Sequence, residues 1–162
     1  MRSREGLFLV SALLFVAGVG LIVLAAANGR TPVASTETPL VPVASVGHIM
    51  RGIVDPAANV VFGAVSTTVT AAGVEEKAPR TPEEWDAVAN SAAALAEAGN
   101  LLLVGTRRVD DRDWTRFATS LSTSSTVALR AAEARDAKGV FDSGEAIYNA
   151  CDGCHRLYER TE

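Results

Sequence analysis

Residues 151–155 have the sequence Cys151-Asp152-Gly153-Cys154-His155 and contain the only two cysteines of the 162-residue chain. In a helix, positions 151, 154 and 155 lie on one face. The spacing Cys-x-x-Cys-His is that of covalent haem attachment, in which two thiols add to the haem vinyl groups and the imidazole reaches the iron. The pentapeptide therefore predicts one covalent haem c bound by Cys151 and Cys154, with His155 as an iron ligand.

Two other uses of these cysteines fit the sequence less well. A thioredoxin-like pair needs a βαβ setting and a helix N-terminus that lowers the pKa of one thiol. Here the motif comes late in a helical stretch, close to the end of the sequence. A structural zinc ion needs four ligands, and the cysteines and His155 are joined only by the distant His48. Haem attachment is therefore the preferred interpretation.

The first 27 residues have the pattern of an export signal or a membrane anchor. Arg2 and Arg4 precede an apolar run from Leu7 to Ala27 that contains no charged residue. A helix of this length, at about 1.5 Å per residue, spans the roughly 30 Å hydrocarbon core of a membrane. The short basic flank places its N-terminus in the cytoplasm. The length favours an uncleaved anchor, whereas Ala25-Ala26-Ala27 offers a signal-peptide cleavage site as the alternative.

Export agrees with the cysteine motif, because c-type haem is attached outside the cytoplasm. We therefore expect the domain on the periplasmic side of a bacterial inner membrane, either anchored or soluble after signal cleavage. Residues 28–44 follow as a linker that contains Pro32, Pro39 and Pro42 and shows no apolar period. Such a segment favours an extended polyproline conformation. It would act as a tether for a mobile carrier or as a spacer from the lipid headgroups.

Residues 45–162 are one domain in length. Apolar residues that recur every three or four positions predict helices at about 46–69, from Thr81 to a stop at Gly105, from about 110 onward, and at about 141–160. The second helix has the strongest start, because Thr81-Pro82-Glu83-Glu84 forms a capping box. Four such helices predict an all-α, antiparallel four-helix bundle. Its longest loop is expected at 71–80.

The predicted inner faces follow from the same spacing. Pro56 interrupts the first helix and predicts a kink near 52–56. The polar run 122–126 in the third helix either makes room for a bulky group or forms a solvated face. The inward positions are expected to be Val46, Ile49, Met50, Ile53, Ala57, Val60, Ala64 and Val65 in the first helix, Trp85, Val88, Ala92, Leu95, Gly99 and Leu102 in the second, Trp114, Phe117, Leu121, Ser124, Ala128 and Ala131 in the third, and Ile147, Cys151, Cys154 and Tyr158 in the fourth.

The chain resembles the class II c-type cytochromes, the cytochrome c prime family. The features that carry the resemblance are the four helical segments and the haem motif in the last one, followed three residues later by Tyr158. The resemblance covers residues 45–160, and in most other c-type families the motif lies near the N-terminus. Family members often have a basic residue directly after the aromatic one, where this chain has Glu159. That difference and Pro56 indicate a divergent member.

The resemblance also implies that the first helix faces the iron. An apolar residue there leaves the iron five-coordinate and open to nitric oxide or carbon monoxide, whereas a methionine gives a low-spin electron carrier. Met50 is the only methionine besides Met1, and it is the predicted sixth ligand. His48 is the competing ligand, and simple core packing is the other interpretation of Met50. Arg51 is a candidate partner for a haem propionate, because guanidinium suits carboxylate.

These features predict a monohaem cytochrome that carries single electrons between redox partner proteins. No acid–base pair or nucleophile constellation is recognisable, so an enzyme is not expected. The formal net charge of −4 argues against nucleic acid as a partner. The first alternative is a five-coordinate protein that binds nitric oxide or carbon monoxide. The second alternative is a haem-bearing accessory subunit of a respiratory membrane complex.

Overall fold

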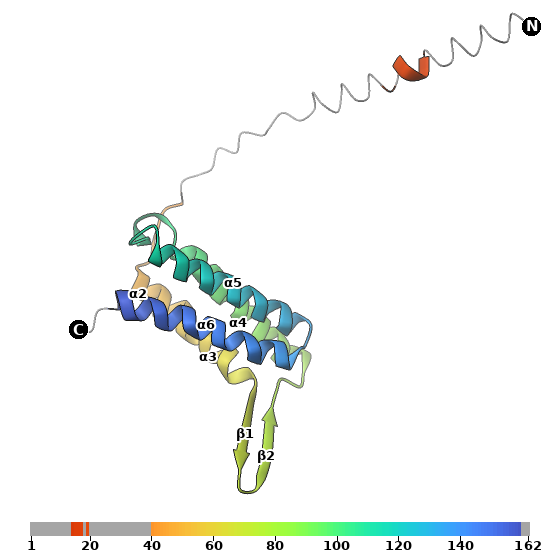
Figure 1. The fold of residues 1–162 in the computed structure, drawn as a ribbon, viewed down its shortest axis with the longest axis vertical. Helices are drawn as coiled ribbons and strands as arrows, with labels where there is room; N and C mark the ends of the chain where they lie inside the picture. Colours follow the sequence, from red (N-terminus) through yellow and green to blue (C-terminus); the bar gives the residue numbers. More distant parts are fainter. Residues whose placement is uncertain (1–13, 18, 20–39, 160–162) are drawn as a thin grey trace, which may run out of the picture. The chain divides into compact units, whose positions relative to one another are not determined.

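The computed structural model describes residues 14–17, 19 and 40–159 (Figure 1). Residues 14–17 and 19 are helical, and the rest of the predicted anchor and most of the predicted linker lie outside the described residues. Among the described residues, no helix is both long and apolar enough to cross a membrane. The chain divides into two units between Pro39 and Leu40, and the second unit contains the haem motif.

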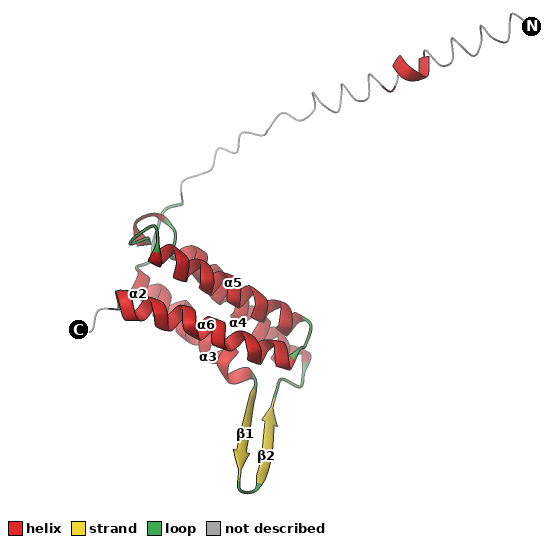
Figure 2. Ribbon diagram, viewed as in Figure 1, coloured by secondary structure: helices red, strands yellow, loops and turns green. Residues whose placement is uncertain are grey.

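The second unit is mostly helical, as Figure 2 shows. The main packing is α4 on α5 and α5 on α6, and α3 packs on α4 and more lightly on α6. A short connection joins α5 to α6, and the longer segment 102–112 joins α4 to α5; these helices lie side by side in Figure 1. The α-helices of this unit are α2 (Val46–Ile49), α3 (Asp55–Ala64), α4 (Pro82–Leu101), α5 (Asp113–Glu133) and α6 (Ala137–Tyr158), with a π-helical turn at Met50–Val54 and a 3₁₀ turn at Gly105–Arg107.

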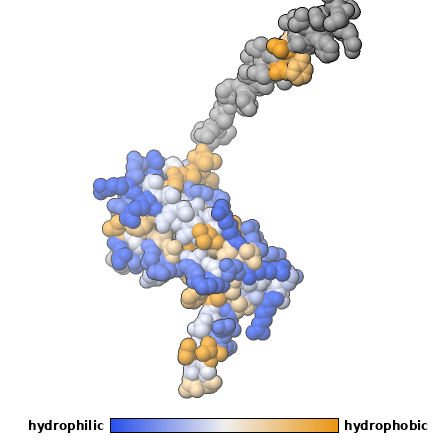
Figure 3. Space-filling model, turned by 45° about the vertical axis from the view of Figure 1, so that its right-hand side comes forward, coloured by the Kyte–Doolittle hydropathy of each residue, from blue (hydrophilic) through white to orange (hydrophobic). Residues whose placement is uncertain are grey.

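A β-hairpin between α3 and α4 corrects the all-α prediction. The strands β1 (Ser66–Thr70) and β2 (Gly73–Lys77) pair antiparallel, with Val69 opposite Val74. The expected helix to residue 69 and loop at 71–80 were therefore wrong. Four consecutive β-branched residues, 67–70, favour strand over helix, and Gly73 adopts a φ of +136° directly after the two-residue turn. Figure 3 shows apolar surface near the hairpin tip, where Val69 and Val74 are exposed.

The interruption expected at Pro56 takes the form of the π-helical turn at Met50–Val54. Asp55 donates its backbone N–H to the carbonyl of Met50, five residues earlier. The extra residue in this turn shifts the buried face, so that the fully buried positions step from Ile49 to Val54. After the turn, the predicted inward residues Ala57 and Ala64 are buried, but Val60 is exposed and Val61 is buried in its place.

The helix boundaries follow capping side chains. The predicted capping box at Thr81 is confirmed, but α4 ends at Leu101, before the expected stop at Gly105. The α5 N-terminus is capped by Asp110, whose Oδ1 accepts the backbone N–H groups of Arg112 and Trp114. Helix α6 begins before the predicted start at residue 141, because Asp136 caps it by accepting the backbone N–H of Gly139.

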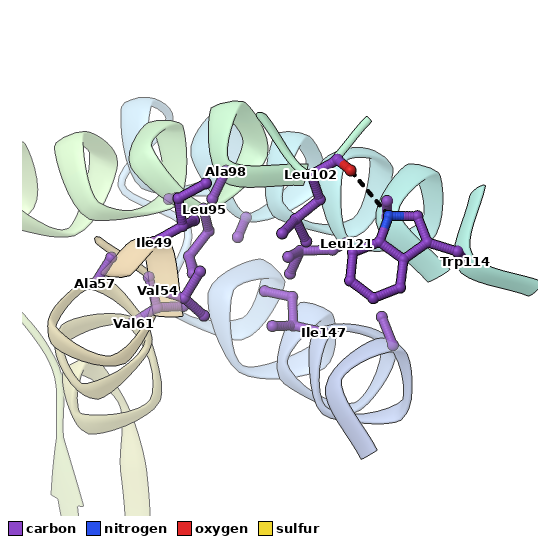
Figure 4. Close-up of a cluster of buried hydrophobic side chains, with 14 residues drawn as sticks. Ile49, Val54, Ala57, Val61, Leu95, Ala98, Leu102, Trp114, Leu121 and Ile147 are labelled. Carbon is purple, nitrogen blue, oxygen red and sulfur yellow. Dashed lines mark hydrogen bonds between the residues drawn. The ribbon is translucent and has the colours of Figure 1, made fainter. Parts of the chain in front are cut away.

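The hydrophobic core lies between these helices (Figure 4). Close contact between α4 and α5 depends on Gly99, because a Cβ there would lie 2.5 Å from the carbonyl oxygen of Ala118 and 2.9 Å from Ser122. Within the polar run 122–126, Ser124 and Ser125 are buried and Thr123 is exposed, and the small residue Ser122 makes room for α4. The predicted inner positions Trp85, Val88, Ala92, Leu95, Leu102, Trp114, Phe117, Leu121, Ala128 and Ile147 are all buried.

Candidate functional site

The haem motif lies near the C-terminal end of α6, as predicted. Cys151 and Cys154 are free thiols of intermediate exposure, and both pack against the hydrophobic core cluster. Ile147, one turn earlier on the same stripe, is fully buried. Gly153, between the cysteines, is pressed against the ring of Phe117, because a Cβ there would lie 2.3 Å from that ring. The face of α6 that carries the cysteines therefore points into the fold.

A cavity of about 400 Å³ adjoins these cysteines. Its volume falls in the range of roughly 300–1,000 Å³ that is typical of cofactor and ligand pockets. It brings Met50 together with Cys151, Cys154 and His155, although these residues come from opposite ends of the domain sequence. The remaining lining residues are mostly apolar: Val54, Asp55, Ala58, Asn59, Phe62, Leu102, Phe117, Ala118, Leu121 and Ala150.

Met50 begins the π-helical turn and is partly buried. It is the only one of the three candidates from this part of the chain that lines the cavity. The ring of His48 is exposed, and its Nδ1 lies 2.7 Å from Oγ of Ser45, the residue that caps α2. Arg51 is also exposed, and its guanidinium lies over Gly47. The geometry therefore favours Met50 over His48 as a cavity ligand and leaves the propionate role of Arg51 as a prediction.

A second hollow lies on the outer side of α6. Its volume is about 520 Å³, and it shares Cys151 and His155 with the first cavity. The side chain of His155 is 48% exposed, and its Nδ1 lies 3.3 Å from Oε2 of Glu159. In the same hollow, Nη2 of Arg156 lies 2.9 Å from Oδ2 of Asp152. The imidazole of His155 therefore borders the inner cavity and also contacts a carboxylate on its outer side.

The electrostatic setting of the thiols opposes a redox-active dithiol. Burial raises the pKa of the Cys154 thiol to about 11, and the neighbouring Cys151 and Asp110 add to this shift. Burial is also the main cause that raises the pKa of Cys151. Reactive cysteines instead have a lowered pKa, and they often lie at a helix N-terminus, whereas these thiols lie in the last turns of α6. These thiols therefore have the setting of unreactive cysteines rather than that of a redox-active pair.

A polar contact that the sequence did not indicate fixes the end of α6 next to the cysteines. The hydroxyl of Tyr158 donates a hydrogen bond to Oδ2 of Asp110. This bond is the main cause that lowers the pKa of Asp110 and raises the pKa of Tyr158 to about 12. The Tyr158 ring also meets Trp114 edge-on, with ring centroids 5.1 Å apart. Figure 4 shows the second anchor of Trp114, a 2.8 Å hydrogen bond from Nε1 to the carbonyl of Leu102.

The zinc interpretation has no support from the described residues. In residues 14–17, 19 and 40–159, no group of three or more Cys, His, Asp or Glu side chains could hold a metal ion. His48 does not line the cavity that holds the cysteines. A haem needs fewer protein ligands, because the porphyrin itself supplies most of the donors to the iron.

Comparison with known proteins finds no matching family model, no matching curated protein and no matching solved structure. The functional interpretation therefore depends on the chemistry of the residues around the cavity.

Proposed function

We propose that this protein is a monohaem c-type cytochrome, related to the class II cytochromes, that carries single electrons between redox partner proteins. One observation carries the proposal: Met50 lines the same cavity as Cys151, Cys154 and His155. These four residues are the side chains that a covalent His/Met-ligated haem requires, and the cavity unites them from the two ends of the domain. In this proposal, α2 with α3, α4, α5 and α6 form a four-helix bundle.

Each of the four side chains has a defined role in the proposal. Cys151 and Cys154 would hold the haem through thioether bonds, and a nitrogen of His155 and the sulfur of Met50 would be the protein ligands of its iron. When bound, the haem supplies an iron that changes between the ferric and ferrous states and so carries one electron. The apolar side chains of the cavity, such as Leu121 and Phe117, exclude water from the site and bury apolar surface.

The five-coordinate alternative has one observation in its favour. Val54 and Phe62 line the same wall of the cavity as Met50. Apolar side chains on that wall would leave room for a small gas molecule if Met50 turned away from the iron. The coordination of the ferrous protein separates the two functions, because a site closed by Met50 binds carbon monoxide poorly.

The location and partners belong to the same proposal. The domain acts on the periplasmic side of a bacterial inner membrane, where the segment 1–27 anchors it or is removed on export. The chain then exchanges electrons with other redox proteins, either as a tethered carrier or within a larger respiratory complex. Co-purification of the native protein with a large membrane complex would favour the accessory-subunit alternative.

Covalent attachment is the experiment that tests the proposal. The full chain, expressed in a host that attaches haem outside the cytoplasm, should retain its haem after denaturation and acid-acetone extraction. The double variant C151S/C154S should lose that covalent haem, and S143A, a buried change on the same helix, should keep it. Haem that passes into the organic phase from the unmodified protein, or a chain that binds none, would overturn the proposal.

A further inference from the structure

The outer side of His155 carries a carboxylate at a fixed position. Glu159 caps the C-terminus of α6 and donates its backbone N–H to the carbonyl of His155 at 2.9 Å. Its side chain turns back over the same residue, so that Oε2 lies 3.3 Å from Nδ1 of His155. The spacing of four residues places the two side chains on one face of the helix. Both backbone and side chain of Glu159 therefore engage the predicted iron ligand.

The surroundings leave this carboxylate directed at the imidazole. The cation on the next residue, Arg156, is paired with Asp152 at 2.9 Å. The last carbonyl groups of α6, at the negative end of the helix dipole, lie in the same turn as His155. His155 therefore shares the outer hollow with two carboxylates and one paired guanidinium, and of these groups the Glu159 carboxylate is the one that contacts Nδ1.

We propose that Glu159 is a positioning residue for the iron ligand His155, an inference that rests on the proposed function. The two ring nitrogens of histidine have separate roles, because the partner of one determines what the other can bind. A carboxylate 3.3 Å from Nδ1 favours the tautomer that carries its proton on Nδ1, which would leave the lone pair of Nε2 for the iron. A carboxylate behind a ligating imidazole also makes that imidazole a stronger donor.

We expect the Glu159 carboxylate to lower the midpoint potential of the haem iron. A stronger donor nitrogen and a nearby negative charge both stabilise ferric iron relative to ferrous iron. Met50 acts in the opposite direction, because a thioether ligand raises the potential. The potential of the site would therefore be set by two side chains of this chain with opposing effects.

The experiment compares two changes that remove equal charge from the same hollow. E159Q removes the carboxylate that contacts His155, and the control D152N removes the carboxylate that is paired with Arg156. We expect a clear rise in midpoint potential for E159Q, a larger rise for E159K, and a smaller one for D152N. In the M50A background, where the iron is open, the ferrous iron–histidine stretching frequency should fall in E159Q and stay unchanged in D152N.

Failure of the proposed function and failure of the proposed role of Glu159 give different results. The covalent haem content of every variant is measured first, and a wild-type chain without covalent haem overturns the proposed function itself. If the haem is attached, equal potentials and equal stretching frequencies in E159Q and D152N overturn the role of Glu159 and leave the cytochrome assignment intact. E159K keeps the test valid if E159Q loses haem, because it changes the same contact with a different side chain.

Discussion

At the scale of single residues, the position of Met50 decides which kind of haem protein this chain would be. Its side chain is partly buried at the first residue of the π-helical turn, and it lines the cavity shared by the cysteines. Such turns are frequent at functional sites, because they redirect side chains without ending the helix. A thioether that reaches the iron from this turn would close the site to other ligands.

The variant M50A tests this role. The unmodified protein should be low-spin, with a near-infrared band from the thioether–iron pair, and should bind carbon monoxide poorly when ferrous. M50A should become high-spin, bind carbon monoxide readily and show a lower midpoint potential, because the thioether favours ferrous iron. M50L is the packing control, since it fills similar volume without the sulfur. A wild type that is already high-spin would show that Met50 serves only as packing.

A second prediction at this scale concerns the hydrogen bond from Tyr158 to Asp110. This bond lowers the pKa of Asp110 below its ordinary value. It therefore stabilises the folded state at pH values above the ordinary pKa of a carboxyl group. That contribution is lost as the pH falls from about 4 through the lowered pKa of the folded state. At pH 7, the free energy of unfolding should be lower in Y158F than in the unmodified protein. On acidification, it should decrease less in Y158F than in the unmodified protein.

Urea denaturation across pH 2 to 7 provides the measurement for Y158F. The control is Y148F, which removes an exposed hydroxyl from the same helix. If Y158F and Y148F lose stability to the same extent and with the same pH dependence, the contact with Asp110 does not hold the end of α6.

The residues of the site differ in how far the sequence predicts them. Cys151, Cys154 and His155 form a local motif whose spacing carries the chemistry, so no fold is needed to identify them. Met50 is predicted in the site because it is the only methionine besides Met1, lies on the inner stripe of the first helix, and occupies the helix that faces the iron in the family. The partner of Tyr158 could not be predicted, because Asp110 is 48 residues away and no local pattern specifies such a contact. The acid at Glu159 was noticed only as a departure from the family.

At the scale of elements, the backbone departs from the predicted helical repeat at two places. The π-helical turn inserts one residue into the repeat, so that the buried positions step from Ile49 to Val54. The apolar period alone predicts a helix to residue 69, but the β-branched residues 67–70 form a strand, and Gly73 permits the turn that follows it. The long helices were predicted well, because the capping box at Thr81 and their apolar stripes agree with each other.

The contact between α4 and α5 gives a prediction that belongs to this scale. G99A should destabilise the fold by about 1–3 kcal/mol, because its methyl group meets the rigid backbone carbonyl of Ala118. The matched control is G63A in α3, where no described heavy atom lies within 4 Å of an added Cβ. That change should be neutral or stabilise the helix by up to about 1 kcal/mol. Chemical denaturation measures both, and equal effects would contradict the close packing of the two helices.

At the scale of the whole molecule, the chain combines a domain with an N-terminal segment of different character. The domain has polar helix surfaces and a buried core, whereas residues 7–27 contain no charge. Of this segment, positions 14–17 and 19 are described as helical, and the large apolar side chains among them, Leu14, Phe15, Val16 and Val19, are exposed. An uncharged run of this length is the sequence pattern expected of a membrane anchor or a targeting segment.

Retention of this segment as an anchor is the prediction at this scale. Alkaline carbonate washing should leave the full chain in the membrane pellet, because the apolar run is long enough to span the hydrocarbon core. V16R places a charge near the middle of the run and costs roughly 3 kcal/mol for insertion, so it should shift the protein toward the soluble fraction. The matched change V19A keeps the run apolar and should leave the protein in the pellet. A mature N-terminus at Asn28, found by mass spectrometry of the purified protein, would show instead that the segment is a cleaved signal and that it does not anchor the domain.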